Sequence, residues 1–147
     1  MSMNYTRIVV AGIAGIAAMT IVGVYGAPML GLAPMNPATM LAGVMGGIAA
    51  LGWLAHFMVG VVLAFGYVFA APYLPGPGPV RGAIYSIAPW LIAQLVMMPM
   101  MGNPIFSGSV VIAMASLIAH FVFGLVIGAI LGVGRSAPAF ESARPVM

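Results

Sequence analysis

Four long stretches without a charged side chain dominate this chain and restrict what it can fold into. They cover residues 8–30, 41–71, 82–101 and 108–133. About 20 apolar residues let a helix cross the roughly 30 Å hydrocarbon core of a bilayer. The sequence therefore predicts an all-α, integral membrane four-helix bundle. The first stretch is longer than the ~7–15 apolar residues of a signal peptide, so we interpret it as a retained span.

The composition excludes several classes of function. Charged residues make up 3% of the 147 residues and hydrophobic residues 64%, so we expect a lipid bilayer to surround the chain. The chain has no cysteine, and its single acid, Glu141, lies near the carboxyl terminus. Thiolate metal sites and paired-carboxylate chemistry are therefore excluded, and independent catalysis is not expected. The net charge of +3 forms no basic patch, which argues against a nucleic-acid partner.

The arginines predict an orientation. Arg7, Arg81 and Arg135 each flank a span, and with four spans all three fall on one side of the membrane. The loops on the other side carry no charge. The positive-inside rule then places both termini in the cytoplasm. We accordingly expect one transmembrane domain over residues 1–133 and a polar cytoplasmic tail over residues 134–147.

The sequence is duplicated. The segment LAHFMVG at residues 54–60 matches IAHFVFG at residues 118–124, and PMNP at residues 34–37 matches PMMGNP at residues 99–104. The second and fourth spans run in the same direction. The bundle is therefore predicted to consist of two parallel helical-hairpin repeats related by an axis along the membrane normal.

The two histidines are the most informative polar residues. His56 and His120 are the only histidines of the chain, occupy equivalent positions of the repeat and lie near the middle of their spans. A histidine inside a membrane normally faces the protein interior. Small residues lie four positions before and after each one, and these residues are Gly52, Gly60, Ser116 and Gly124.

This pattern favours a tetrapyrrole site. Two imidazoles at equal depth could bind one haem iron as axial ligands, and small residues one turn away would leave room for the ring. The first prediction is therefore a small subunit of a membrane redox system, with a b-type haem between His56 and His120 for electron transfer. A chlorin pigment would satisfy the same pattern.

Two other interpretations stay open. The histidines could form hydrogen bonds between helices of a cofactor-free structural or accessory subunit, because small residues at a spacing of four also allow membrane helices to pack closely. Alternatively, the chain could be a small carrier or channel, with Met97 and Met101 as thioether ligands of Cu(I). Each interpretation allows a larger membrane complex or a homo-oligomer as partner.

Several strings of the sequence resemble a known family. PMNPATMLAGVMGG, GWLAHFMVGVVLAFGYVF, LPGPGPVRGAIY, PWLIAQLVMMPMMG and FSGS together are similar to an uncharacterised family of small four-helix bacterial membrane proteins, a domain of unknown function. The resemblance covers nearly the whole chain apart from the tail. It implies four spans and a location in the bacterial inner membrane, and it implies no activity.

Overall fold

Residues 4–132 are described by the computed structural model of the chain, and they form helices and no β-strand. Four helical segments, Tyr5–Met29, Ala49–Tyr73, Gly78–Met100 and Val110–Leu131, are long and apolar enough to cross a membrane. The prediction of an all-α chain with four such segments is confirmed, and the chain is a multi-pass membrane protein. The predicted tail, residues 134–147, lies outside the described residues, as does Arg135.

Two of the spans are interrupted by π-helical turns. In chain order, the elements of the spans are α1 (Tyr5–Ile21), the π-helix η1 (Val22–Gly26), α2 (Ala27–Met29), α4 (Ala49–Ala70), the 3-10 turn η2 (Ala71–Tyr73), α5 (Gly78–Ile92), the π-helix η3 (Ala93–Met97), α6 (Met98–Met100) and α7 (Val110–Leu131). The connections contain a short helix, α3 (Pro37–Val44), and a 3-10 turn, η4 (Ile105–Gly108).

The second span begins later than residue 41, where the sequence placed its start. Gly46 and Gly47 have φ values of 72° and 79°, which end the short helix α3 before α4 begins at Ala49. Only glycine adopts such values without a steric cost. At the other end of α3, the side chain of Asn36 accepts hydrogen bonds from the backbone N–H groups of Ala38 and Thr39. Residues 41–48 therefore belong to α3 and to the turn that follows it.

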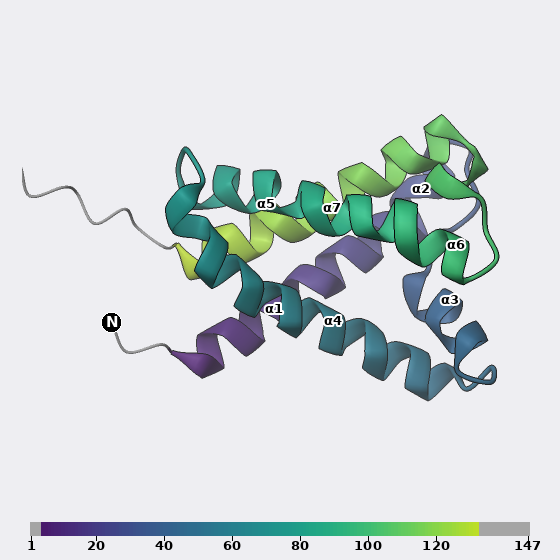
Figure 1. Ribbon diagram of the computed structural model, residues 1–147, viewed down its shortest axis with the longest axis horizontal. Helices are drawn as coiled ribbons and strands as arrows, with labels where there is room; N and C mark the ends of the chain where they lie inside the picture. The colour runs from purple at the N-terminus through teal and green to yellow at the C-terminus, as the bar shows by residue number, and fades with distance from the viewer. Residues whose placement is uncertain (1–3, 133–147) are drawn as a thin grey trace, which may run out of the picture.

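The helix α1 lies at the centre of the arrangement. It contacts both α4 and α7. In Figure 1 it runs diagonally and crosses α4, with α5 and α7 in the upper part of the view. The core between these helices contains the fully buried side chains of Ile16, Tyr67, Phe123 and Ile127. The helix α5 packs mainly on α7, and α1 packs on α4. The two helices of each predicted hairpin are therefore neighbours.

Glycines allow α5 and α7 to approach each other very closely. A Cβ atom on Gly82 would collide with the backbone carbonyl of Gly124, and one on Gly128 would collide with the carbonyl of Gly78. In α1 and α4 the corresponding contact is made by Gly12, whose Cβ would lie 2.6 Å from Cα of Val61. Such close backbone contact is how helices gain packing energy in lipid, where there is no hydrophobic effect between them.

The outer surface of the bundle is apolar. Large side chains such as Ile21, Val62 and Phe69 are well over half exposed. In water this surface would be costly, whereas in a bilayer it contacts hydrocarbon. The exposed side chains therefore agree with a lipid environment around the four long helices.

The first and third spans end in the same local geometry. A π-helical turn precedes Pro28 in the first span and Pro99 in the third. Proline has no N–H to donate to the preceding turn, and a π-helical turn adjusts the hydrogen-bond ladder there. The glycines that follow, Gly31 and Gly102, both have a φ of 76°.

Candidate functional site

His56 is held inside the bundle by a hydrogen bond to another helix. Its side chain, on α4, is only 3% exposed. The Nε2 atom lies 3.0 Å from the hydroxyl oxygen of Thr20 on α1, and Thr20 is also buried. Thr20 could not be predicted as this partner, because one threonine in an apolar stretch carries no signal about what it contacts.

The hydroxyl of Thr20 fixes the tautomer of His56. This hydroxyl has one hydrogen atom, and it donates this hydrogen to the carbonyl of Ile16, at 2.8 Å. The contact with His56 therefore requires the imidazole to donate from Nε2. An imidazolium inside this apolar bundle would be costly, so we infer that the ring is neutral and that the other nitrogen, Nδ1, carries a lone pair. His56 thus links α4 to α1.

His120 is bonded differently from His56. It lies near the middle of α7, is half-buried, and its Nδ1 is 2.8 Å from the backbone carbonyl of Ser116, one turn earlier in the same helix. A carbonyl only accepts, so Nδ1 donates and Nε2 carries the lone pair. Among residues 4–132, the hydrogen bond of His120 thus stays within its own helix, whereas that of His56 joins two helices.

The small residues beside His56 are covered by backbone. A Cβ atom on Gly52 would collide with the carbonyl of Ala38 in α3. One on Gly60 would collide with the side chain of Ile16 and lie 2.9 Å from the carbonyl of Gly12 in α1. Both glycines therefore serve helix packing in this arrangement, and neither leaves an open space next to His56.

The small residues beside His120 are equally occupied. Gly124 packs on the backbone of Gly82 in α5. The hydroxyl of Ser116 accepts hydrogen bonds from the indole N–H of Trp90, at 3.0 Å, and from the side-chain amide of Gln94, at 2.9 Å, and donates to the carbonyl of Ala113, at 3.2 Å. Ser116 therefore anchors the third span on the fourth.

Ser116 belongs to a polar cluster of four side chains. We define it as Trp90, Gln94, Ser107 and Ser116. The hydroxyl of Ser107 donates to the side-chain oxygen of Gln94, at 3.1 Å, and the indole of Trp90 also donates to Ala113, at 3.1 Å. Gln94 is 2% exposed and lies on the π-helix η3. A π-helical turn inside a helix frequently marks a functional position. A glutamine in an apolar span is a visible polar residue of the sequence, but the sequence carries no signal about its partners.

The turn that supplies Ser107 has an unusual backbone. Phe106 and Ser107 have φ values of 51° and 56°, and Gly108 follows with 66°. The left-handed region costs an ordinary residue about 1–2 kcal/mol. Such conformations persist only when surrounding contacts hold them, and they concentrate at functional sites.

The geometry does not fit a haem between His56 and His120. Binding of the iron by both Nε2 atoms would break the hydrogen bond from His56 to Thr20. The glycines that were expected to admit the ring contact neighbouring backbone instead. The haem and chlorin predictions thus stay predictions, and the packing of the described residues does not favour them.

The residues predicted for copper lie at the end of the third span. Met97 ends η3 and Met101 follows α6, and the N–H of Met101 donates to the carbonyl of Met97, at 3.1 Å, so the two lie one helical turn apart. Among residues 4–132, no three His, Cys, Asp or Glu side chains are grouped as metal ligands. The Cu(I) site stays a prediction.

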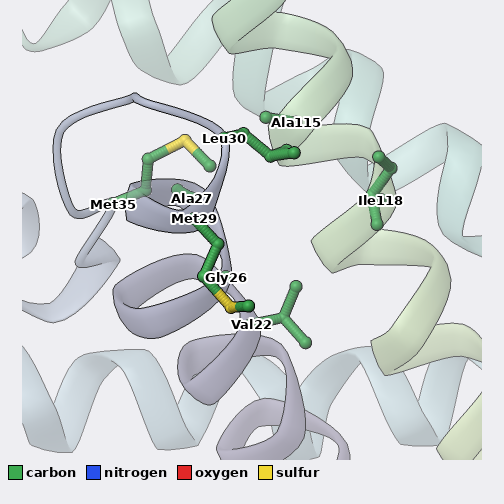
Figure 2. Close-up of a pocket in the computed structure, with 8 residues that line it drawn as sticks. All are labelled: Val22, Gly26, Ala27, Met29, Leu30, Met35, Ala115 and Ile118. Atoms are coloured by element: carbon green, nitrogen blue, oxygen red, sulfur yellow. The ribbon is translucent and has the colours of Figure 1, made fainter.

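Two hollows open on the surface, and no histidine lines either of them. One, of about 290 Å³, lies between the end of the first span and α7, where Met29, Met35 and Ile118 contribute to its wall (Figure 2). The other, of about 280 Å³, is lined by residues of α1 and α4, including Phe57 and Val61. Both are lined by apolar side chains, so they suit hydrocarbon rather than a polar ligand.

The described fold and its interior define a class of protein: a small multi-pass membrane protein with a closely packed, hydrogen-bonded interior. The chain belongs to DUF6789, a family of unknown function whose model matches residues 3–142. This confirms the resemblance to an uncharacterised family. No curated protein and no solved structure matches the chain.

Proposed function

We propose that this protein is a cofactor-free accessory or scaffold subunit of a membrane complex. The observation that carries the proposal is the interior itself. Both histidines are hydrogen-bonded, one of them to another helix, and the glycines beside them contact backbone. An interior filled in this way supports helix packing, and this is the role on which the proposal rests.

An absorption spectrum of the detergent-purified protein tests this proposal against the redox subunit. The protein is expressed with ample haem and measured oxidised and then reduced with dithionite, next to His56→Ala and His120→Ala. We expect no Soret band in any sample. A Soret band with reduced α and β bands that both variants lose would instead identify a bis-histidine cytochrome. A chlorin would appear in the same spectrum as a long-wavelength band.

Native electrophoresis of mildly solubilised membranes tests the accessory role. The chain has a mass of 15.0 kDa, so a monomer is readily separated from a larger complex. We expect the protein in a complex of defined size that contains other subunits. Migration as a monomer under conditions that preserve known complexes of the same membrane would contradict the proposal.

The carrier interpretation has its own test. It predicts Cu(I) uptake into vesicles that contain the purified protein and loss of uptake in a variant with Met97→Leu and Met101→Leu. Under the accessory role we expect no uptake above that of empty vesicles. The packed interior supports this expectation, because neither surface hollow is lined by the polar cluster or by the histidines.

We also propose that the bundle consists of two parallel helical-hairpin repeats. Support comes from the equivalent close contacts, at Gly12 and Gly60 in one pair of helices and at Gly82 and Gly124 in the other. Further support comes from the shared end geometry of the first and third spans, with a π-helical turn, a proline and a left-handed glycine in each. Separately expressed halves, residues 1–73 and 74–147, test the proposal, because repeat units that pack as wholes should reassociate in one membrane.

Both termini are proposed to lie in the cytoplasm of a bacterium, with the chain in its inner membrane. Arg7 and Arg81 support this orientation, because each lies near the start of a span that runs toward the uncharged loops. Reporter fusions test it: a fluorescent protein that matures only in the cytoplasm should be bright after residue 147. An active periplasmic phosphatase at that position would contradict the orientation.

A further inference from the structure

The turn η4 and the polar cluster beneath it suggest a moving part. Phe106, Ser107 and Gly108 adopt left-handed backbone angles in succession, with φ values of 51°, 56° and 66°. For Phe106 and Ser107 this region is disfavoured, because the Cβ atom approaches the following carbonyl. The observed conformation of η4 therefore depends on contacts that the turn makes with the rest of the bundle.

Two contacts hold the turn on the third span. The hydroxyl of Ser107 donates to the side-chain oxygen of Gln94, at 3.1 Å. The ring of Phe106 lies against that of Trp90, with 5.9 Å between the centroids. Gln94 and Trp90 are 2% and 7% exposed. The turn thus covers two buried polar side chains with one hydrogen bond and one ring contact.

The ends of the turn allow it to move without the helices. Gly102 precedes it with a φ of 76°, and a Cβ atom at this position would meet nothing within 4 Å. Gly108 is its last residue, and the extended Ser109 follows, immediately before α7 begins at Val110. Glycine rotates freely through both halves of φ space, so a change of angles at Gly102 and Gly108 would displace the turn alone.

The covered groups are incompletely bonded. The side-chain amide of Gln94 donates one hydrogen bond, to Ser116, although it carries two hydrogen atoms. The single indole N–H of Trp90 donates to two acceptors, the carbonyl of Ala113 at 3.1 Å and the hydroxyl of Ser116 at 3.0 Å. Once Ser107 moves away, the side-chain oxygen of Gln94 also loses the hydrogen bond that the turn donates to it.

From these observations we propose that η4 is a two-state lid. In the closed state, which is the one described, Phe106 and Ser107 cover the polar cluster. In the open state the turn relaxes to right-handed or extended angles, and water reaches Trp90, Gln94 and Ser116 from the side of the membrane where η4 lies. Backbone strain favours opening, and the contacts with Gln94 and Trp90 favour closing.

The absence of native cysteine allows a direct test by thiol labelling. Ala113→Cys places a reporter in the cluster, because Ala113 is 1% exposed and its carbonyl accepts from Trp90. Its labelling rate by a water-soluble thiol reagent is measured in the purified full chain. The rate is compared in three proteins that carry this reporter: one with the native Ser107, one with Ser107→Ala and one with Ser107→Gly.

The lid predicts a specific order of rates. Ser107→Ala removes the hydrogen bond and keeps the backbone cost, so labelling should accelerate about two- to tenfold. Ser107→Gly removes the same hydrogen bond and also the cost of the left-handed angles, so it should label about fivefold more slowly than Ser107→Ala. A loop with only a structural role would not distinguish alanine from glycine in this way.

A second reporter separates lid opening from unfolding. Ala64→Cys lies in the core between the helices, where Ala64 is 0% exposed. Its labelling rate should be the same with all three residues at position 107. Equal rates at Ala113→Cys in the three backgrounds would overturn the lid. A parallel acceleration at Ala64→Cys would overturn it too, because the whole bundle would then open.

Discussion

Two pairs of helices pack closely in this bundle, α1 with α4 and α5 with α7. Both pairs pack through glycines, but they are linked by different polar contacts. Within each pair the two helices approach closely at glycines. These are Gly12 and Gly60 in the first pair and Gly82 and Gly124 in the second. In the first pair the polar link is His56 to Thr20. In the second pair it is Ser116 to Trp90 and Gln94.

This difference shows that an equivalent sequence position does not give an equivalent role. His56 and His120 occupy matching places in similar strings of residues, yet within the part of the chain that the structure describes, only His56 bonds to another helix. The cause lies in the neighbouring helix. Thr20 presents a hydroxyl to His56, whereas the third span presents the larger Trp90 and Gln94 to Ser116, one turn before His120. The side chains of the neighbouring helix thus determine which hydrogen bond each histidine forms.

The largest effect is expected at the glycine contact of the second pair. Gly82→Ala would push its Cβ into the carbonyl of Gly124, and backbone cannot move aside cheaply. We expect a loss of unfolding free energy of about 3 kcal/mol, the upper end of the usual cost of overpacking. Gly60→Ala is the matched variant. Its Cβ meets the side chain of Ile16 first and the carbonyl of Gly12 at 2.9 Å, so the loss should be smaller, about 2 kcal/mol. Unfolding in detergent, followed by circular dichroism, would contradict the account if the order were reversed.

The next effect is expected at His56. His56→Ala removes a buried side chain and its bond to Thr20, so we expect a loss of about 2 kcal/mol from the cavity and the hydrogen bond together. A double-mutant cycle with Thr20→Val should give a coupling energy of about 0.6–1.7 kcal/mol. The same cycle between Thr20→Val and His120→Ala should give none. Coupling of equal size in both cycles would remove the distinction between the two histidines.

A smaller effect is expected in the polar cluster of the second pair. Gln94→Leu keeps the approximate volume and removes the bonds to Ser107 and Ser116. We expect a loss of about 1 kcal/mol, because each partner keeps another contact or reaches solvent. The measurement is the same detergent unfolding. No loss at all would mean that this cluster does not link the third and fourth spans.

The smallest effect is expected at His120. Its side-chain bond goes to a carbonyl of its own helix, and the residue is half-buried. His120→Ala should therefore cost about 0.5 kcal/mol, a quarter of the loss at His56. A loss as large as that of His56→Ala would show that His120 has a partner of equal importance.

The sequence predicted the class of fold well and the site less well. Long uncharged stretches predict membrane-spanning helices from length and hydropathy alone, which is why four such segments were found. The uncharged stretch over residues 41–71 begins before α4 does, because Gly46 and Gly47 belong to the apolar run although their backbone ends a helix. The partner of His56 could not be predicted, since Thr20 lies 36 residues away on another helix and only packing brings them together.

The glycine pattern illustrates a second limit. Gly52, Gly60 and Gly124 at a spacing of four from a histidine predict either room for a ring or a helix contact. The choice between the two depends on how close the neighbouring helix lies to these glycines. A single sequence contains no information about the distance between the helices. In the fold, α3, α1 and α5 occupy these positions.

The most direct test of the account is the protonation state of the two histidines, measured by nitrogen NMR on protein labelled with ¹⁵N only in histidine. Two histidines give two sets of signals, and His120→Gln assigns them. The account predicts two neutral imidazoles of opposite tautomer: His56 protonated at Nε2 and His120 protonated at Nδ1. Signals displaced or broadened by a bound metal, or the same tautomer at both positions, would contradict it.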